Sequence, residues 1–228
     1  MTTTPNPADD PGLRLLAGLA LGRAVEAIRP EMSAAAERPE EIEHVHRMRV
    51  ASRRMRAALA GLGDVFRPKR VRRWRKEIRR VTKRLGEARD LDVQAASLGR
   101  FLEELQTAAA RPGLERLRLR TRQARVRMQP RVVGAIERLA RSGVLEEIEA
   151  AARERVIESR LEAPEPRTPA VYGEAYRQVA RRIDALAAFG PYVEDAAHVR
   201  ELHEMRIAAK ELRYTLELFA PAFADGLR

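Results

Sequence analysis

Hydrophobic residues recur every three to four positions along almost the whole chain, and no stretch alternates convincingly between apolar and polar residues as a half-buried strand does. Proline, glycine and polar residues interrupt this periodicity at a few places. The sequence therefore predicts an all-α protein. The expected helices cover residues 12–37, 41–66, 68–87, 90–110, 116–131, 144–160, 171–189 and 196–221.

The expected helix boundaries follow residues that interrupt helices. Breaks are predicted at Arg38-Pro39, at Arg67-Pro68 and at Leu85-Gly86, and Asp90 is a suitable N-cap for the helix that follows. Pro130 is expected to kink or restart the basic helix in which it lies. Residues 1–11 are polar and proline-rich and are expected to form a flexible tail, and residues 158–170 hold three prolines and are expected to form a linker.

Composition narrows the class of protein. Apolar residues make up 45% of the 228 residues and aromatic residues only 4%, which is typical of a folded helical protein rather than a disordered chain. No run of eighteen apolar residues occurs, so no membrane span is expected. Cysteine is absent, which excludes a disulfide scaffold and a thiolate metal site. A cytoplasmic location fits these features.

The positive charge is concentrated in one region. The formal net charge is +11, yet residues 44–89 alone hold seventeen Lys or Arg against three acidic residues, a net charge of +14. The rest of the chain is slightly acidic. Such an asymmetric charge implies a polyanionic partner: nucleic acid, an anionic membrane or a phosphate polymer.

An internal repeat places part of this charge on two helices. HRMRVASRRMRAALAGL (46–62) aligns without gaps to HEMRIAAKELRYTLELF (203–219). At about 100° per residue, each copy carries a basic stripe opposite an apolar face. Off the stripes, Arg47 and Arg54 are replaced by Glu204 and Glu211, whereas the stripe charge is kept. The stripes are His46, Arg49, Arg53 and Arg56, and His203, Arg206, Lys210 and Arg213. The apolar faces are Met48, Ala51, Met55, Leu59 and Leu62, and Met205, Ala208, Leu212, Leu216 and Phe219.

A third basic stripe is predicted in residues 67–86. It comprises Lys69, Arg72, Lys76, Arg79 and Lys83, with Trp74 and four aliphatic residues on the opposite face. Trp74 is therefore expected in the core rather than as a platform for stacking nucleic-acid bases. A stripe about 20 Å long suits an extended polyanion better than a single phosphate.

Two other functions are weighed against polymer binding. The stripes contain no Asn, Gln or aromatic residue, which argues against base-specific recognition and leaves non-specific nucleic-acid binding as the main alternative. Asp90 and Asp92 could hold a divalent ion for catalysis, although one is expected as an N-cap and the other could pair with Arg89. No phosphate-binding loop or HExxH motif accompanies them. An enzyme that processes a phosphate polymer is the weaker alternative, and no cofactor, metal site or catalytic residue is predicted.

Three segments together resemble the CHAD domain, the conserved histidine α-helical domain. They are HVHRMRVASRRMRAAL, LGEARDLDV and HEMRIAAKELRYTLELF, in the order typical of that family. The resemblance implies helical bundles related by pseudo-twofold symmetry around a basic groove that binds inorganic polyphosphate, with polyphosphate granules as a further partner. Residues 12–157 would form the first helical half and residues 171–228 the second.

The resemblance also implies a set of binding residues. The groove would be lined by His46, Arg49, Arg53, Arg56, Lys76, Arg79, Lys83, His203, Arg206, Lys210 and Arg213. After the second His-Arg helix the family pattern continues into another basic helix, whereas this sequence ends at Arg228. We therefore expect either a fragment of a longer protein or a shortened second half.

Overall fold

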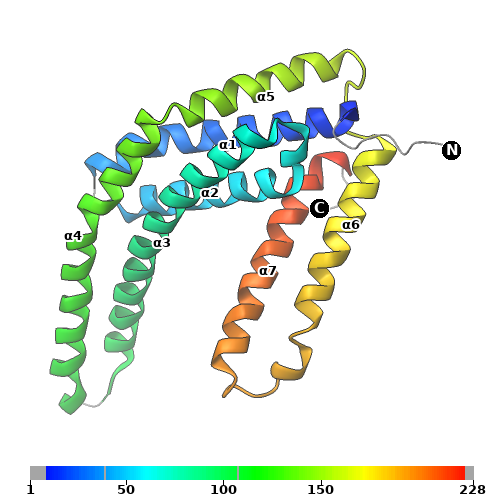
Figure 1. Ribbon diagram of the computed structural model, residues 1–228. Coiled ribbons are helices and arrows are strands. Elements are labelled where there is room, and N and C mark those ends of the chain that lie inside the picture. The colour runs from blue at the N-terminus through cyan, green and yellow to red at the C-terminus, as the bar shows by residue number, and fades with distance from the viewer. Residues whose placement is uncertain (1–8, 39, 107, 224–228) are drawn as a thin grey trace. The chain divides into compact units, whose positions relative to one another are not determined.

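The computed structural model describes residues 9–38, 40–106 and 108–223, and all regular structure within these ranges is helical (Figure 1). This confirms the predicted all-α fold. The α-helices are α1 (Pro11–Glu37), α2 (Ile42–Leu62), α3 (Pro68–Glu104), α4 (Arg111–Arg141), α5 (Val144–Arg160), α6 (Pro169–Ala187) and α7 (Val199–Phe219). Within the described part of the chain, no helix is long and apolar enough to cross a membrane.

Two expected interruptions do not occur. Helix α3 runs without a break through Gly86, and α4 continues through Pro130. A glycine inside a helix costs only about 1 kcal/mol relative to alanine. Buried Leu85 and Ala88 keep the apolar face of α3 in register across Gly86. Beyond Pro130, α4 buries Val132, Ile136 and Leu139, so packing outweighs the lost backbone hydrogen bond. Asp90 lies inside α3 and is not an N-cap.

The chain divides into two compact units. Unit 1 comprises the described residues up to Arg23, Arg54–Arg72 and everything from Glu147 onward. Unit 2 comprises Ala24–Arg53 and Arg73–Glu146. Helices α1, α2, α3 and α5 therefore contribute residues to both units.

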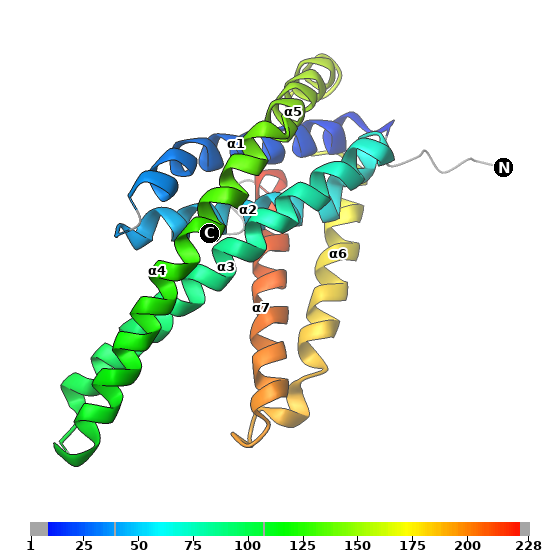
Figure 2. The ribbon, with the colours of Figure 1, turned by 60° about the vertical axis from the view of Figure 1, so that its left-hand side comes forward.

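Unit 2 is built on the antiparallel pair α3 and α4, which lie side by side in both ribbon views (Figures 1 and 2). Near one end, Arg73 Nη2 donates a hydrogen bond to the Ser142 carbonyl at 2.5 Å. The core of this unit includes Trp74, whose side chain is fully buried, so the prediction that Trp74 is a core residue is confirmed. Met48, Ile78 and Leu85 are buried as well.

Unit 1 contains the α6–α7 pair, and residues near the beginning of α6 form hydrogen bonds with the segment before α1 and with the segment after α7. Thr168 caps the start of α6 and also donates a hydrogen bond to Asp10, the residue before α1, at 2.8 Å. The Tyr172 hydroxyl donates to the Ala222 carbonyl at 3.2 Å, just after α7. Of the tail expected over residues 1–11, residues 1–8 lie outside the described part, and Pro11 already belongs to α1.

The apolar faces of the two repeat copies differ in burial. All five residues of the first face are buried, as predicted: Met48, Ala51, Met55, Leu59 and Leu62. In the second copy only Phe219 is buried, while Met205, Ala208 and Leu212 are half-buried and Leu216 is 37% exposed. The prediction for this face is therefore wrong for most of its length. From Tyr176 to Arg213 no residue of α6, α7 or their connection is buried, because a two-helix layer leaves each helix open on its outer sides.

The corner between α1 and α2 is held by a cluster of charged side chains within unit 2. The His44 ring lies between two carboxylates, with Nδ1 2.7 Å from Glu31 Oε2 and Nε2 2.8 Å from Glu41 Oε2. Arg47 Nε donates to Glu31 Oε1 at 2.7 Å. Burial alone would raise the pKa of Glu31, but hydrogen bonds from Arg47 and His44 outweigh it and hold the pKa below its usual value of 4.5.

This cluster predicts a loss of stability in acid. A carboxyl whose pKa is lowered by folding stabilises the fold above its unfolded-state pKa, and this contribution is lost as the pH falls through the folded-state value. We expect the free energy of unfolding to decrease as the pH falls below about 4.5, and to decrease less in Glu31→Gln. Urea unfolding at a series of pH values measures this. Parallel curves for the two proteins would contradict it.

Candidate polyanion-binding site

The basic stripe of α2 is partly covered rather than fully solvated. His46, Arg49 and Arg53 are half-buried and Arg56 is exposed. His46 Nδ1 is buried and accepts or donates no hydrogen bond within the described residues, which leaves Nε2 as the ring nitrogen able to contact a ligand. Partial burial fixes these side chains on their helix and lowers the entropy lost when they bind an anion.

Arg49 joins the stripe of α2 to the face of α3. Its Nη2 lies 4.0 Å from Asp90 Oδ1, and a Cβ atom at Gly86 would lie 3.6 Å from its Nε. On α3, Gly86 and Asp90 share the helix face of Arg79 and Lys83, within about 60°. Within unit 2, Arg49 therefore places the α2 stripe next to the part of the α3 stripe that holds Arg79 and Lys83.

The stripe of α3 consists of exposed cations, most of which have no counter-charge within the described residues. Within the described residues, Arg72, Lys76 and Arg79 form no ion pair. Lys83 Nζ reaches Glu87 Oε1 only at 4.0 Å, and its side chain is 71% exposed. Parallel cations that repel one another are retained here without compensation, which favours a role in binding an external anion.

Arginines off the stripes behave differently. Each of four is paired with a carboxylate at short distance: Arg47 with Glu31 at 2.7 Å, Arg54 with Glu217 at 2.9 Å, Arg80 with Glu77 at 2.5 Å and Arg84 with Glu87 at 2.7 Å. The structure thus separates two kinds of basic side chain in one charged region. These four off-stripe arginines are neutralised locally, whereas Arg72, Lys76 and Arg79 of the α3 stripe form no ion pair within the described residues.

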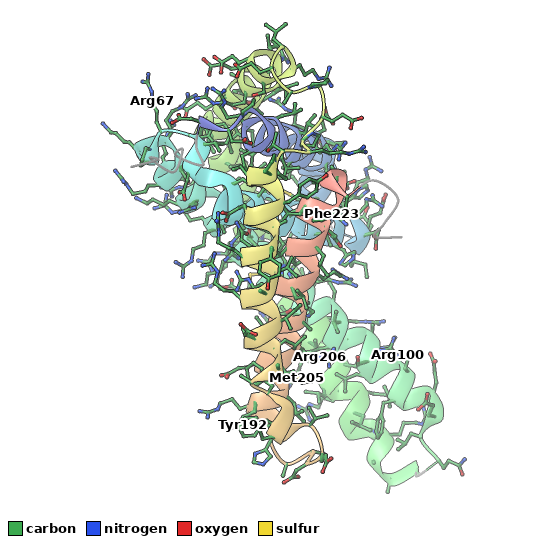
Figure 3. The ribbon with its side chains drawn as sticks, turned by 90° about the vertical axis from the view of Figure 1, so that its right-hand side faces the viewer. Arg67, Arg100, Tyr192, Met205, Arg206 and Phe223 are labelled. Carbon is green, nitrogen blue, oxygen red and sulfur yellow. The ribbon has the colours of Figure 1, made fainter. Side chains whose placement is uncertain are left out.

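The stripe of α7 belongs to unit 1. All four of its residues, His203, Arg206, Lys210 and Arg213, are exposed. Arg206 lies in the half of α7 nearer to Tyr192 than to Phe223 (Figure 3). Within the described residues, His203 and Arg206 form no ion pair. Arg213 Nε lies 3.5 Å from Glu217 Oε1, and its guanidinium is 5.1 Å from the ring centroid of Tyr214.

The two aspartates of LGEARDLDV have separate roles. Asp90 is exposed and faces Arg49, whereas the Asp92 side chain is only 2% exposed and Oδ1 accepts a hydrogen bond from Arg125 Nε at 2.9 Å. Arg125 also donates to Gln129, whose Nε2 donates to the Ala35 carbonyl of α1. The two carboxylates therefore point into different environments, and the divalent-ion site weighed from the sequence does not form between them.

Burial dominates the electrostatics of Asp92. Its desolvation raises the pKa of the carboxyl above its usual value, although the charge and hydrogen bond of Arg125 act in the opposite direction. Asp92 Oδ2 and Arg125 Nη2 are also buried without a hydrogen-bond partner in the described structure. The Asp92–Arg125 pair holds α3 against α4, and Gln129 binds α1 at the same position. The pair thereby positions α3, the helix that carries the Lys76–Arg79–Lys83 stripe.

Sequence reasoning did not identify the contact of Arg49 with Gly86 or the partner of Asp92. Both depend on how helices pack, and the two members of each pair are 37 and 33 residues apart in the chain. The only sequence signal was the motif itself, a glycine and two aspartates placed directly after a basic helix.

Comparisons with known proteins agree with the helical architecture. The family model of the CHAD domain matches residues 19–228. A crystal structure of the CHAD domain from the plant Ricinus communis superposes with a TM-score of 0.62 at 23% sequence identity, covering 92% of this chain and 66% of that one. At this identity the likeness shows the fold alone.

Two uncharacterized proteins of Mycobacterium tuberculosis, from strains CDC 1551 / Oshkosh and ATCC 25618 / H37Rv, are each 32% identical over 187 residues. The match covers 79% of this chain, which spans only about a third (35%) of the length of these relatives. The chain is a member of the CHAD domain family.

Proposed function

We propose that this protein binds inorganic polyphosphate, without catalysis, along the face formed by the adjoining stripes of α2 and α3. The observation that carries the proposal is the row of exposed cations Arg72, Lys76 and Arg79, which form no ion pair within the described residues, while neighbouring off-stripe arginines do. The stripe of α7 in unit 1, the repeat copy of the α2 stripe, is proposed as a polyphosphate-binding stripe in its own right, formed by His203, Arg206, Lys210 and Arg213.

The linear arrangement favours a polymer over a small phosphate compound. Lys69 and Lys83 are separated by about 21 Å at 1.5 Å per residue, and the cations between them repeat at every turn. A regular chain of phosphates can contact all of them at once. Each exposed contact contributes little, about 0–1 kcal/mol, so the affinity depends on the number of contacts made together.

Nucleic acid is the main competitor for this face. Its bases would need amide side chains or exposed aromatic rings beside the cations, and neither stripe has one. Trp74, the one tryptophan of the chain, is fully buried. We therefore infer that nucleic acid binds only non-specifically, through its phosphates. A cytoplasmic protein that associates with polyphosphate granules fits this proposal.

Titration of the purified protein with long-chain polyphosphate at physiological salt tests the proposal, with duplex and single-stranded DNA as competitors. We expect DNA at equal phosphate concentration to leave most of the polyphosphate bound, because the spacing of the cations and not charge density alone would select the ligand. Displacement by DNA would contradict this and favour a general polyanion surface. Polymer length is analysed in parallel, with and without a divalent metal. Shortening of the polymer would show an enzyme instead.

A further inference from the structure

Helix α4 carries a fourth set of basic residues, which we name the α4 stripe: Arg116, Arg120, Arg127 and Arg131. At about 100° per residue they fall within ~60° of one another over about 22 Å. All four side chains are exposed, and none forms an ion pair within the described residues. Every member is arginine, whose planar fork of donors binds phosphate oxygens in pairs.

The α4 stripe faces away from α3. The contact between these helices is fixed by Arg125 on α4 and Asp92 on α3, and a Cβ atom at Gly99 of α3 would lie 3.4 Å from Cζ of Arg118 on α4. The stripe residues lie roughly 120–180° around α4 from Arg125. On α3, Lys76, Arg79 and Lys83 lie roughly 140–180° around the helix from Asp92. Beside the Asp92–Arg125 contact, the two stripes therefore lie on opposite outer sides of the helix pair.

Toward the far end of α4, the helix face that carries the stripe borders a cleft shared with α3. Gly134 follows Arg131 on the same helix face, and it lines this cleft together with Arg73, Glu77, Arg138 and Arg141. A Cβ atom at Gly134 would meet no other atom within 4 Å, so this position leaves the cleft open to solvent. The guanidinium groups of this cleft are already engaged: Arg138 Nε lies 3.8 Å from Glu77 Oε2, Arg141 Nη2 lies 3.7 Å from Glu137 Oε2, and Arg73 donates to the Ser142 carbonyl. The available cations of the α4 stripe therefore end at Arg131.

We propose that the α4 stripe is a second phosphate-polymer-binding face, so that one molecule holds two polyphosphate segments on opposite sides of the α3–α4 pair. This inference rests on the proposed function and extends it from binding one segment to bridging two. The ligand is the same for both faces because each presents a row of cations and no group that reads a base. A protein that binds two polyphosphate segments at once would neutralise part of the charge of both. It would thereby bring the segments together and condense the polymer.

A sandwich assay tests the bridge. Polyphosphate is immobilised on beads and loaded with protein, and the washed beads are then offered fluorescent polyphosphate. The stripe variant carries Gln at positions Arg116, Arg120, Arg127 and Arg131. The matched control carries Gln at Arg23, Arg153, Arg160 and Arg167, which are also exposed and give the same change in charge. Because all the replaced side chains are exposed, both variants should melt near the wild-type temperature.

We expect wild type and control to retain the fluorescent polymer, and the stripe variant to load on the beads but retain at least about tenfold less. Equal retention by variant and control would overturn the second face. Failure of wild type to load would overturn the proposed function together with the bridge, whereas loading without any sandwich would overturn the bridge alone. If the stripe variant still retained the fluorescent polymer but no longer bound phosphatidylglycerol vesicles, the α4 stripe would bind a lipid surface instead. That result would overturn the inference.

Discussion

Replacement of Lys76 and Arg79 by glutamine is expected to weaken polyphosphate binding by roughly 10-fold at low salt, and the slope of affinity against salt should become shallower by about two released counterions. The reason is that both side chains are exposed cations that form no ion pair within the described residues. Isothermal titration calorimetry at several salt concentrations measures both quantities.

The matched control is the replacement of Arg80 and Arg84 by glutamine. These residues lie on the same helix and carry the same charge, but they are paired with Glu77 and Glu87. Their loss should change the affinity several-fold less, because their charge is already engaged. If both double variants lost equal affinity, the region would act as bulk charge rather than as an ordered stripe.

The largest effect on stability is expected from Arg125→Ala, which should lower the free energy of unfolding by about 3–5 kcal/mol. Removing one partner of a buried ion pair leaves the other charge buried and uncompensated. Asp92 is that charge, and its oxygen Oδ1 would lose the guanidinium hydrogen bond at 2.9 Å. Urea unfolding, followed by circular dichroism, gives the value.

Two further measurements make this prediction specific. The double variant Asp92→Leu with Arg125→Leu should recover most of the lost stability, because it removes both buried charges. The deficit of Arg125→Ala should also shrink in acid. Burial raises the pKa of Asp92, so folding favours the protonated carboxyl. The protonated carboxyl therefore stabilises the fold at low pH, and this contribution is lost as the pH rises through the folded-state pKa. A deficit below about 1 kcal/mol at neutral pH would show that the pair does not hold α3 and α4 together.

Hydrophobic periodicity was sufficient to predict the fold class and most helices, because each helix buries one face. The exceptions were positions where packing overrides local preference. Gly86 and Pro130 suggested ends, yet the apolar residues beyond them continue the buried faces of α3 and α4. Likewise, an apolar stripe on α7 predicted burial, but Leu216 remains 37% exposed, and Met205, Ala208 and Leu212 are only half-buried. Periodicity shows which face can be buried and not how much of it is covered.

The sequence predicts the rows of cations on single helices, but it does not predict how these rows adjoin in the folded protein. Spacing along one helix places Lys76, Arg79 and Lys83 in line, since that depends only on helical geometry. The junction at Arg49 depends on two helices meeting at Gly86, and the support from Arg125 comes from a third helix. For Arg47 and Arg54 the sequence also could not identify an ion pair, because their partners Glu31 and Glu217 lie 16 and 163 residues away in the chain.

The central claim, that polyphosphate lies along the α3 stripe, can be tested by measuring lysine reactivity. The chain has four lysines, Lys69, Lys76, Lys83 and Lys210, and all of them lie on stripes of α3 or α7. Acetylation rates at each lysine would be compared with and without bound polyphosphate, with monomeric phosphate at the same phosphate concentration as control. We expect polyphosphate to slow acetylation of Lys76 and Lys83 at least several-fold, and monomeric phosphate to leave both rates unchanged. Unchanged rates at both lysines while the polymer is bound would contradict it.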